Sequence, residues 1–298
     1  MAYKENRIEK IFDILNIFIL SILGLATLYP FIYILSASFS IPEAVARREV
    51  FLYPIGFTLK AYRLVFRSSE ILLAYYNTVW YTVVGTLINV LMTTSAAYPL
   101  SRKNFSLRSI IMVYITITMF FSGGLIPFYI LVNRLGLYNT RWALVIPGAV
   151  SAWNLMMARV FFQTTIPDEL IDAARIDGAN EITIFFKIVL PLSKPILAVL
   201  ALYYGVAHWN DFFGPLIFLS DPKLQPLSIY LRKVLIQAQL YSGEYSGGLE
   251  QLQGMINYAL VEQVKYATVI VALLPIMMSY PFLQKYFVKG VMIGALKE

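Results

Sequence analysis

Long apolar runs alternate with shorter polar stretches along the whole chain of 298 residues. An α-helix of about 20 apolar residues crosses the hydrocarbon core of a bilayer, and the runs reach that length. A barrel strand needs only about 9–11 residues of alternating polarity, and that pattern is absent. The pattern therefore predicts an all-α integral membrane protein with six transmembrane helices. The expected spans are residues 11–39, 73–100, 109–132, 143–162, 196–219 and 266–287.

Small and polar residues interrupt two of these spans. In the third span, Ser122, Gly123, Gly124 and Pro127 predict a kink or an unwound turn, because they weaken the helical hydrogen-bond ladder. The second span contains two asparagines and a patch of small, hydroxylated side chains of the kind that mediate contacts between membrane helices. They are Asn77, Asn89, Thr93, Thr94 and Ser95.

Composition supports the membrane class. Charged residues make up 14% of the chain and hydrophobic residues 59%, whereas a soluble domain carries about 25% charged residues. The formal net charge of +7 is spread along the chain, so it indicates membrane topology and headgroup contact and not a nucleic-acid surface. Cysteine is absent from the sequence, which excludes a disulfide framework and thiol chemistry.

The short loops predict an orientation. Lys and Arg gather in residues 1–10, in the loop 101–108 and near the C-terminus, and such clusters favour the cytoplasmic side. Both ends of the chain are therefore expected in the cytoplasm. The predicted organisation is a cytoplasmic N-terminus (1–10), a six-span domain (11–287) with outer loops 40–72 and 220–265, a cytoplasmic polar loop (164–195) and a cytoplasmic tail (288–298).

The polar loop 164–195 is the longest hydrophilic segment expected on the cytoplasmic side. Thr165 is a candidate N-cap for a first short helix, and Gly178 is placed to end it. Asn180 is a candidate cap for a second helix, which Pro191 is expected to stop. The predicted helix–turn–helix is either a docking surface for a partner or a solvated connection between two spans. Its candidate contact residues are Asp168, Glu169, Asp172, Ala173, Ala174, Asp177 and Gly178.

The segment IDAARIDGANEITIFFKIVLPLSKP, which begins at Ile171, resembles the signature loop of ABC-importer permeases, known as the EAA motif. Gly178 stands at the glycine of that motif. Asp172 stands where the family usually has Glu, so the charge is kept and the side chain is one methylene shorter. The resemblance implies that the loop is a coupling-helix loop, which inserts into a groove on a cytoplasmic ATPase subunit.

Three other stretches are similar to the carbohydrate branch of these permeases, which includes maltose permeases. They begin at Ser122 (SGGLIPFYILV), His208 (HWNDFFGPLIFL) and Tyr280 (YPFLQKYFVKGVMIGALKE). The first and last look closest to the subgroup that handles complex oligosaccharides, including uronate chains such as alginate. The resemblance runs from about residue 11 to the end of the chain.

What this resemblance implies is one membrane subunit of an ATP-driven importer in a bacterial cytoplasmic (inner) membrane. The implied partners are a second permease subunit, two copies of an ABC ATPase, an extracytoplasmic solute-binding protein, an oligosaccharide and membrane lipid. ATP and Mg²⁺ would bind to the ATPase subunits. In agreement, the chain contains no G-x-x-x-x-G-K-[ST] phosphate loop, so no catalytic residue and no cofactor are expected in it.

A polar cluster lies inside the fifth expected span. Trp209, Asn210 and Asp211 either line the pore near the sugar path or brace neighbouring helices near the outer face. His208 is the only His in the chain, so no metal site is expected, because a metal needs several ligands.

Two other functions are weighed beside the importer subunit. A secondary transporter or channel subunit would need buried ion-coupling carboxylates, and Asp211 is the only acid inside a core span, since Asp13 stands at the start of the first span. A membrane-embedded enzyme would need a set of His, Asp or Glu at the membrane face. The substrate stays open between acidic and neutral glycans, since the outer loop 40–72 carries five basic and three acidic residues.

Overall fold

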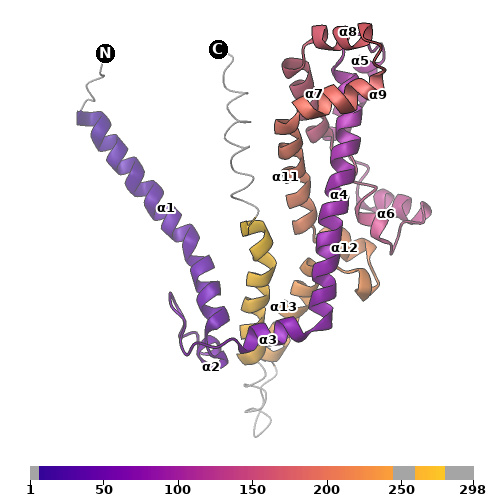
Figure 1. Cartoon of the computed structure of the whole chain (residues 1–298). Helices are drawn as coiled ribbons and strands as arrows, with labels where there is room; N and C mark the ends of the chain where they lie inside the picture. The colour runs from indigo at the N-terminus through magenta and orange to yellow at the C-terminus, as the bar shows by residue number, and fades with distance from the viewer. Residues whose placement is uncertain (1–6, 244–258, 279–298) are drawn as a thin grey trace. The chain divides into compact units, whose positions relative to one another are not determined.

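The computed structural model describes residues 7–243 and 259–278, and every regular element in those ranges is helical (Figure 1). This confirms the all-α prediction for these residues. Contacts divide the chain into two units, residues 1–71 with 231–274 and residues 72–230 with 275–298. The expected tail 288–298, the end of the sixth expected span and part of the outer loop 220–265 lie outside the described residues.

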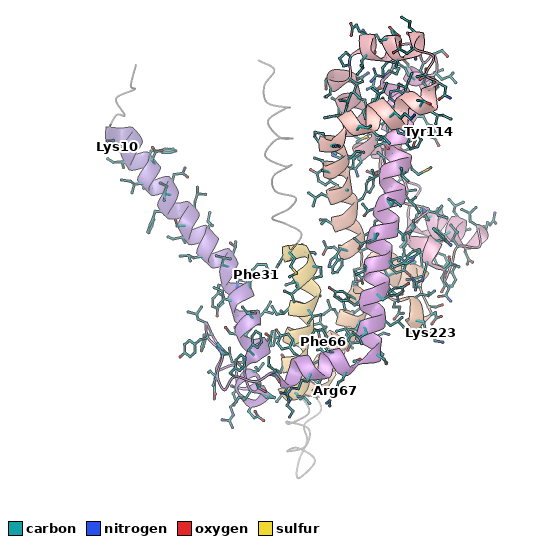
Figure 2. All side chains as sticks on the ribbon, viewed as in Figure 1. Lys10, Phe31, Phe66, Arg67, Tyr114 and Lys223 are labelled. Carbon is teal, nitrogen blue, oxygen red and sulfur yellow. The ribbon has the colours of Figure 1, made fainter. Side chains whose placement is uncertain are left out.

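The first unit begins with α1 (Arg7–Phe39), a helix of 33 residues that contains Pro30. Most of its apolar side chains are exposed, and Ile11, for example, is 64% exposed. Figure 2 shows the side chain of Phe31 standing away from the α1 ribbon. A helix that is apolar on all sides requires an apolar surrounding, such as lipid or a partner helix. The character of α1 therefore agrees with the first expected span.

The outer loop 40–72 contains two short helices, α2 (Pro42–Ala46) and α3 (Lys60–Arg67). α3 buries Ala61 and Val65 on one face and leaves its charged side chains on the other. Residues at positions i and i+4 share one face of a helix, so this spacing anchors α3 to the unit.

Serine side chains fix the loop to the end of α1. Ser36 Oγ donates to the carbonyl of Leu52 at 2.9 Å, and Ser38 Oγ lies 2.8 Å from the hydroxyl of Tyr62 in α3. Burial raises the pKa of the Tyr62 hydroxyl, and the hydrogen bond with Ser38 offsets part of that rise. These side-chain bonds add to the backbone bond from the N–H of Thr58 to the carbonyl of Phe39 at 2.8 Å, which also holds the loop to the end of α1.

A helix at Ala259–Met278 contributes its first part to the same unit. Gln263 is fully buried and donates its side-chain amide to the carbonyl of Ser40. The hydroxyls of Tyr33 and Tyr266 lie 3.4 Å apart, and their rings meet edge to face. These contacts join the first and last expected spans of the chain within one unit.

The second unit holds the remaining elements. In chain order they are α4 (Ser69–Ser101), α5 (Arg108–Phe120), α6 (Leu125–Arg134), the 3₁₀ turn η1 (Arg141–Leu144), α7 (Ala152–Thr165), α8 (Asp168–Ile176), α9 (Glu181–Ile184), the π turn η2 (Phe185–Val189), α10 (Leu190–Leu192), α11 (Lys194–Asn210), α12 (Phe213–Phe218), the 3₁₀ turn η3 (Pro222–Leu224) and α13 (Leu227–Gly243). The first residues of α4 and most of α13 belong to the first unit.

Polar side chains connect α4 to α11, which run beside each other in Figure 1. Thr93 Oγ1 lies 2.7 Å from the hydroxyl of Tyr204, and that hydroxyl also accepts the backbone N–H of Ser151 at 3.0 Å. Farther along, Asn89 Oδ1 lies 2.7 Å from Nε2 of His208. The predicted role of Asn89 and Thr93 in helix–helix contact is confirmed. One tyrosine hydroxyl therefore joins α4, α11 and the N-terminus of α7.

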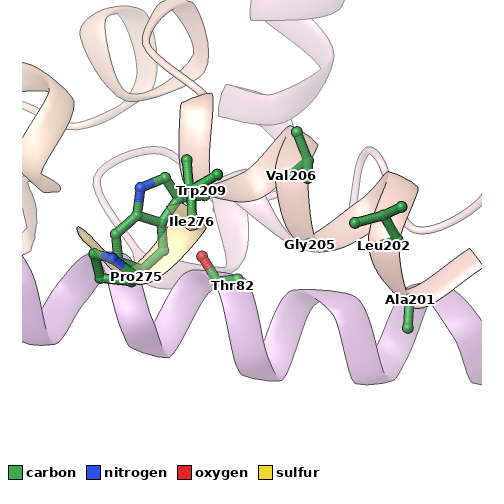
Figure 3. Close-up of a pocket in the computed structure, with 8 residues that line it drawn as sticks. All are labelled: Thr82, Ala201, Leu202, Gly205, Val206, Trp209, Pro275 and Ile276. Atoms are coloured by element: carbon green, nitrogen blue, oxygen red, sulfur yellow. The ribbon is translucent and has the colours of Figure 1, made fainter. Parts of the chain in front are cut away.

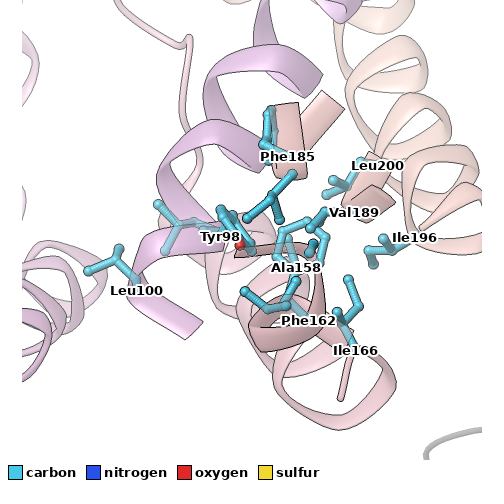
Figure 4. Close-up of a cluster of buried hydrophobic side chains, with 14 of the residues drawn as sticks. Tyr98, Leu100, Ala158, Phe162, Ile166, Phe185, Val189, Ile196 and Leu200 are labelled. Atoms are coloured by element: carbon cyan, nitrogen blue, oxygen red, sulfur yellow. The ribbon is translucent and has the colours of Figure 1, made fainter. Parts of the chain in front are cut away.

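An apolar cluster fills the space between α4, α7, α8, η2 and α11 (Figure 4). Phe162 and Leu200 have no exposed surface, and the rings of Tyr98 and Phe185 pack beside them. Ala158 lies at the centre of the close-up and leaves room for these larger side chains. This cluster is the core that supports the polar loop 164–195.

Two helix pairs are sharply bent. α5 and α6 meet at 119° across a break that includes Gly124, and the helical segment Glu181–Leu192 meets α11 at 82° across Ser193. Gly124 has a backbone φ of +84°, a conformation that L side chains rarely adopt. The kink predicted within the third expected span is confirmed.

The described residues contain three helices that are long and apolar enough to cross a membrane, or up to five if each bent pair is one span. The six-span count and the N-in/C-in orientation stay predictions. Residues 143–162 do not form one span-length helix as expected. Pro147 and Gly148 disfavour helix, and the 14-residue α7 starts only at Ala152.

We expect Phe162→Ala to destabilise the second unit by about 3–5 kcal/mol, because it removes a fully buried ring from a packed core. Thermal unfolding in detergent would measure the loss. Phe121→Ala is the matched control, since that ring is 75% exposed and its removal leaves no cavity. Equal unfolding midpoints for the two variants would contradict the described packing.

Candidate functional site

The candidate coupling-helix loop consists of two short helical segments joined by a tight turn. α8 begins after Pro167, and Asp168 and Glu169 occupy its first turn. Carboxylates in this position are stabilised by the positive end of the helix dipole. The predicted N-cap is wrong, because Thr165 is the last residue of α7 and no side chain caps α8. The extended conformation of Pro167 separates the two helices.

Gly178 ends α8 as predicted. Its φ is +83°, its N–H donates to the carbonyl of Arg175, and the N–H of Ala179 donates to the carbonyl of Ala174, each at 3.0 Å. This pair of bonds is the Schellman arrangement, which satisfies the last carbonyls of a helix. Glycine is favoured because a Cβ is strained at positive φ. The turn is thus fixed by backbone geometry.

The second segment starts and continues differently. Asn180 is the N-cap as predicted, since its Oδ1 accepts the N–H of Thr183 at 2.8 Å. Pro191 does not stop the helix, which runs on through η2 to Leu192. The wider π turn just before Pro191 relieves the clash that a proline ring makes with the preceding turn. The helix breaks at Ser193 instead.

Arg175 ties the two segments together. Its guanidinium contacts Asp172 Oδ1 at 3.1 Å and Glu181 Oε1 at 2.8 Å. The hydrogen bond to Glu181 is the main reason why the pKa of Arg175 is raised. All three side chains are well exposed, so water screens the pairs and they orient the segments more than they stabilise them. Asp172, the departure from the EAA motif, therefore has an internal partner.

The two faces of α8 differ in burial. Ile171 and Ala174 are 2% and 8% exposed and pack into the apolar cluster. Ala174 is therefore not available to a partner surface, which corrects its place among the candidate contact residues. Ala173 and Asp172 lie on the exposed side with the remaining candidates.

The sequence reasoning missed Ile176, which is 87% exposed at the end of α8. A helical turn has 3.6 residues, so Ile176 cannot share a face with Ile171 and Ala174. The helical periodicity of the sequence is therefore the signal from which the exposure of Ile176 could have been predicted. An apolar side chain this exposed beside carboxylates is typical of a contact surface.

Asn210 and Asp211, at the end of α11, form hydrogen bonds that hold this part of the fold together. Asp211 Oδ1 accepts the N–H of Gly214 at 3.1 Å, and its backbone carbonyl accepts the hydroxyl of Ser228 at 2.7 Å. Asn210 Nδ2 donates to the carbonyl of Val206 in its own helix. The fifth expected span is therefore interrupted at Asp211, which joins α11 to α12.

His208 fits closely against α4. Asn89 contacts Nε2 of His208 and also donates its Nδ2 to the carbonyl of Gly148 at 2.6 Å. A Cβ added to Gly85 would lie 2.5 Å from Nε2 of His208. Glycine at position 85 is what allows the imidazole to reach Asn89. Among the described residues, no group of three or more His, Asp or Glu side chains could hold a metal ion.

Trp209 has a different environment. It lines a cavity of about 280 Å³ together with Thr82 and Gly205 (Figure 3). Most of the lining is apolar, and Figure 3 shows the indole ring facing the side where Thr82 projects from α4. Trp209 is thus the only one of the three predicted pore residues that the described structure places at this cavity.

Residues 71–293 match the family described as binding-protein-dependent transport system inner membrane component. The chain belongs to this family. It is an ABC-importer permease and not an enzyme in its own right, as the resemblance of the signature loop implied.

Two relatives cover nearly the whole permease. Protein LplC of Bacillus subtilis (strain 168) is 41% identical over 98% of this chain and 97% of its own length. The polygalacturonan/rhamnogalacturonan transport system permease protein YtcP of the same strain is 37% identical over 97% and 99%.

A solved structure is similar in fold. It is the crystal structure of a bacterial ABC transporter involved in the import of the acidic polysaccharide alginate. One of its chains matches with a TM-score of 0.86 and 33% identity, over 95% of the permease and 99% of that chain. The expected carbohydrate branch of the family is confirmed.

We expect Gly178→Ala to loosen the end of α8 by about 1–2 kcal/mol, because the left-handed conformation is strained for alanine. Hydrogen exchange at the Ala179 amide should become about 5- to 30-fold faster. Gly123→Ala is the matched control, since both glycines have open space around the missing Cβ and only Gly178 has positive φ. Unchanged exchange in Gly178→Ala would refute the described turn.

Proposed function

We propose that this permease couples closure of a cytoplasmic ATPase to sugar translocation through the segment from α8 to α10. The observation that carries the proposal is the exposed face of α8, which combines Asp168, Asp172 and Ile176 at the position of the family's signature loop. The Schellman turn and the Arg175 ion pairs hold this face in one shape. A preformed surface loses less conformational entropy when it binds.

The partners follow from the family. The complete importer contains a second permease subunit, two ATPase subunits and an extracytoplasmic binding protein. It lies in the bacterial cytoplasmic membrane, with the α8 loop on the cytoplasmic side. ATP and Mg²⁺ bind to the ATPase subunits, since this chain lacks a phosphate-binding loop. Our preferred orientation is N-in/C-in, which the basic short loops favour.

The proposed substrate is an oligosaccharide, with an acidic glycan preferred over a neutral one. The support is that the permease is similar to a polygalacturonan/rhamnogalacturonan permease and to a transporter of alginate, both named for acidic polysaccharides. Permeases of arabinooligosaccharides and of melibiose, raffinose and stachyose are more distant, at 28% and 27% identity.

Within the permease, we assign Trp209 to the sugar path, because it lines a cavity and an indole ring packs well against the apolar face of a sugar. Asn210 and Asp211 are assigned a bracing role, since their side chains bond to backbone groups of α11 and of the start of α12. A channel or secondary transporter has no comparable support, because Asp211 is engaged in this joint.

We expect Ile176→Glu to weaken capture of the ATPase by about 30-fold or more, as loss of a central apolar anchor typically does. Co-purification of the ATPase with the tagged permease, at several ATPase concentrations, measures the effect. Leu52→Glu is the matched control, because Leu52 is 58% exposed in the loop expected outside the cell. If Ile176→Glu captured the ATPase normally, the coupling role of α8 would be untenable.

The substrate proposal predicts that the cognate binding protein prefers uronate chains. Trigalacturonate and a trisaccharide of alginate should bind at least about tenfold more tightly than maltotriose in calorimetry, a difference of about 1.4 kcal/mol. Tighter binding of maltotriose would exclude the acidic glycan and leave the neutral one.

A further inference from the structure

Arg102 links the end of α4 to the corner between α7 and α8. Its Nη2 donates to the carbonyl of Phe162 at 2.9 Å, and its Nη1 donates to the carbonyl of Ile166 at 3.2 Å and to Asp168 Oδ1 at 2.9 Å. The guanidinium also lies 5.3 Å from the ring centroid of Tyr98. One side chain thus binds the last turn of α7, the connecting residues and the first turn of α8.

The chemistry of this contact suits arginine alone. The last carbonyls of a helix carry partial negative charge, so a cation there is favourable even though the carbonyl of Phe162 also accepts the N–H of Ile166 at 3.4 Å. Only the planar fork of a guanidinium presents several fixed donors to such acceptors at once. The side chain of Arg102 is 11% exposed, whereas that of Asp168 is 55% exposed. The Arg102 end of the contact is therefore shielded from water, whereas the Asp168 end in α8 is open to it.

A second arginine makes the reverse connection. Arg159 in α7 donates its Nε to the carbonyl of Leu100 in the last turn of α4, at 3.0 Å. The ends of α4 and α7 therefore each supply a guanidinium to carbonyls of the other element. Because hydrogen bonds are directional, the two arginines resist sliding as well as separation.

The apolar cluster alone does not give that resistance. Ile171 and Ala174 of α8 rest on the cluster around Phe162, and such packing opposes compression at native density. Dispersion contacts are not directional, so apolar surfaces can shift past one another at smaller loss. Without a directional contact to α4, a displacement of α8 would change only the connection between α7 and α8 and would not reach α4.

We propose that Arg102 is a positioning residue that transmits displacement of α8 to α4 during the transport cycle. This inference rests on the proposed coupling role of α8. Without this contact, the partner ATPase would still bind and hydrolyse ATP. Fewer of its cycles would produce movement of α4, which lines the proposed sugar path through Thr82.

The test compares Arg102→Ala with wild type in the complete importer, reconstituted in proteoliposomes. The sugar is trigalacturonate or maltotriose, whichever the binding protein prefers. The measured quantity is the ratio of sugar taken up to ATP hydrolysed. We expect Arg102→Ala to assemble normally and to lower this ratio at least about fivefold, the lower end of typical coupling strengths. Arg102→Lys, which keeps the charge and loses the fork, should fall between the two.

Lys103→Ala is the matched control, because it removes the same charge from the neighbouring exposed position and should keep the wild-type ratio. A wild-type ratio for Arg102→Ala would overturn the inference. Should that variant fail to assemble, Arg102→Lys carries the test, and a wild-type ratio there overturns it equally.

A distance measurement separates transmission from mere stability. The natural chain has no cysteine, so spin labels at Leu170→Cys in α8 and Leu87→Cys in α4 are specific, and both positions are exposed. With Arg102, their separation should stay narrow and unchanged between the nucleotide-free state and ATP with vanadate. In Arg102→Ala it should broaden or shift in ATP with vanadate. Identical distributions in the two proteins would refute the tie.

The two proposals fail in different ways. If Ile176→Glu leaves ATPase capture and uptake intact, the coupling role of α8 fails. If Ile176→Glu abolishes capture while Arg102→Ala keeps the wild-type ratio, the coupling role stands and only the role of Arg102 fails.

Discussion

In a bilayer, the hydrophobic effect does not draw one apolar helix to another, because lipid tails are as apolar as leucine. The second unit depends instead on polar contacts that have no better partner in hydrocarbon. The hydroxyl of Tyr204 is the clearest of these, since it meets Thr93 and the N–H of Ser151. It joins three helices at one point, and Tyr204 is itself part of the apolar cluster that supports α8. The loop that carries α8 is supported by both.

This support explains how a polar loop can be both exposed and rigid. Its outer face presents charges and Ile176, while Ile171 and Ala174 reach into the core that Phe162 occupies. The Schellman turn at Gly178 satisfies the backbone without help from a partner. A surface of this kind can receive a force without local unfolding, as a coupling element requires.

Local signals in the sequence predicted much of this structure. Gly178 and Asn180 act through their own backbone and side chains, so their roles were readable from residue type. The break near Gly124 was readable for the same reason. Thr165 was misassigned because α7 continues through it and its C-cap is Ile166. The contacts of Arg102 could not be foreseen, since its partners lie about 60 positions away in the chain. Proximity over such separations is a property of the fold and leaves no mark in a single sequence.

The close fit of Gly85 against His208 has a consequence for how this permease can diverge. No side chain larger than a hydrogen atom is accommodated at position 85 while the imidazole stays bonded to Asn89. Changes at positions 85 and 208 are therefore coupled, because a larger residue at 85 requires the side chain at 208 to shift or to be smaller. A substitution at position 85 alone would therefore displace the imidazole and cost its bond to Asn89. The two positions should consequently vary together wherever the helix pair has been remodelled.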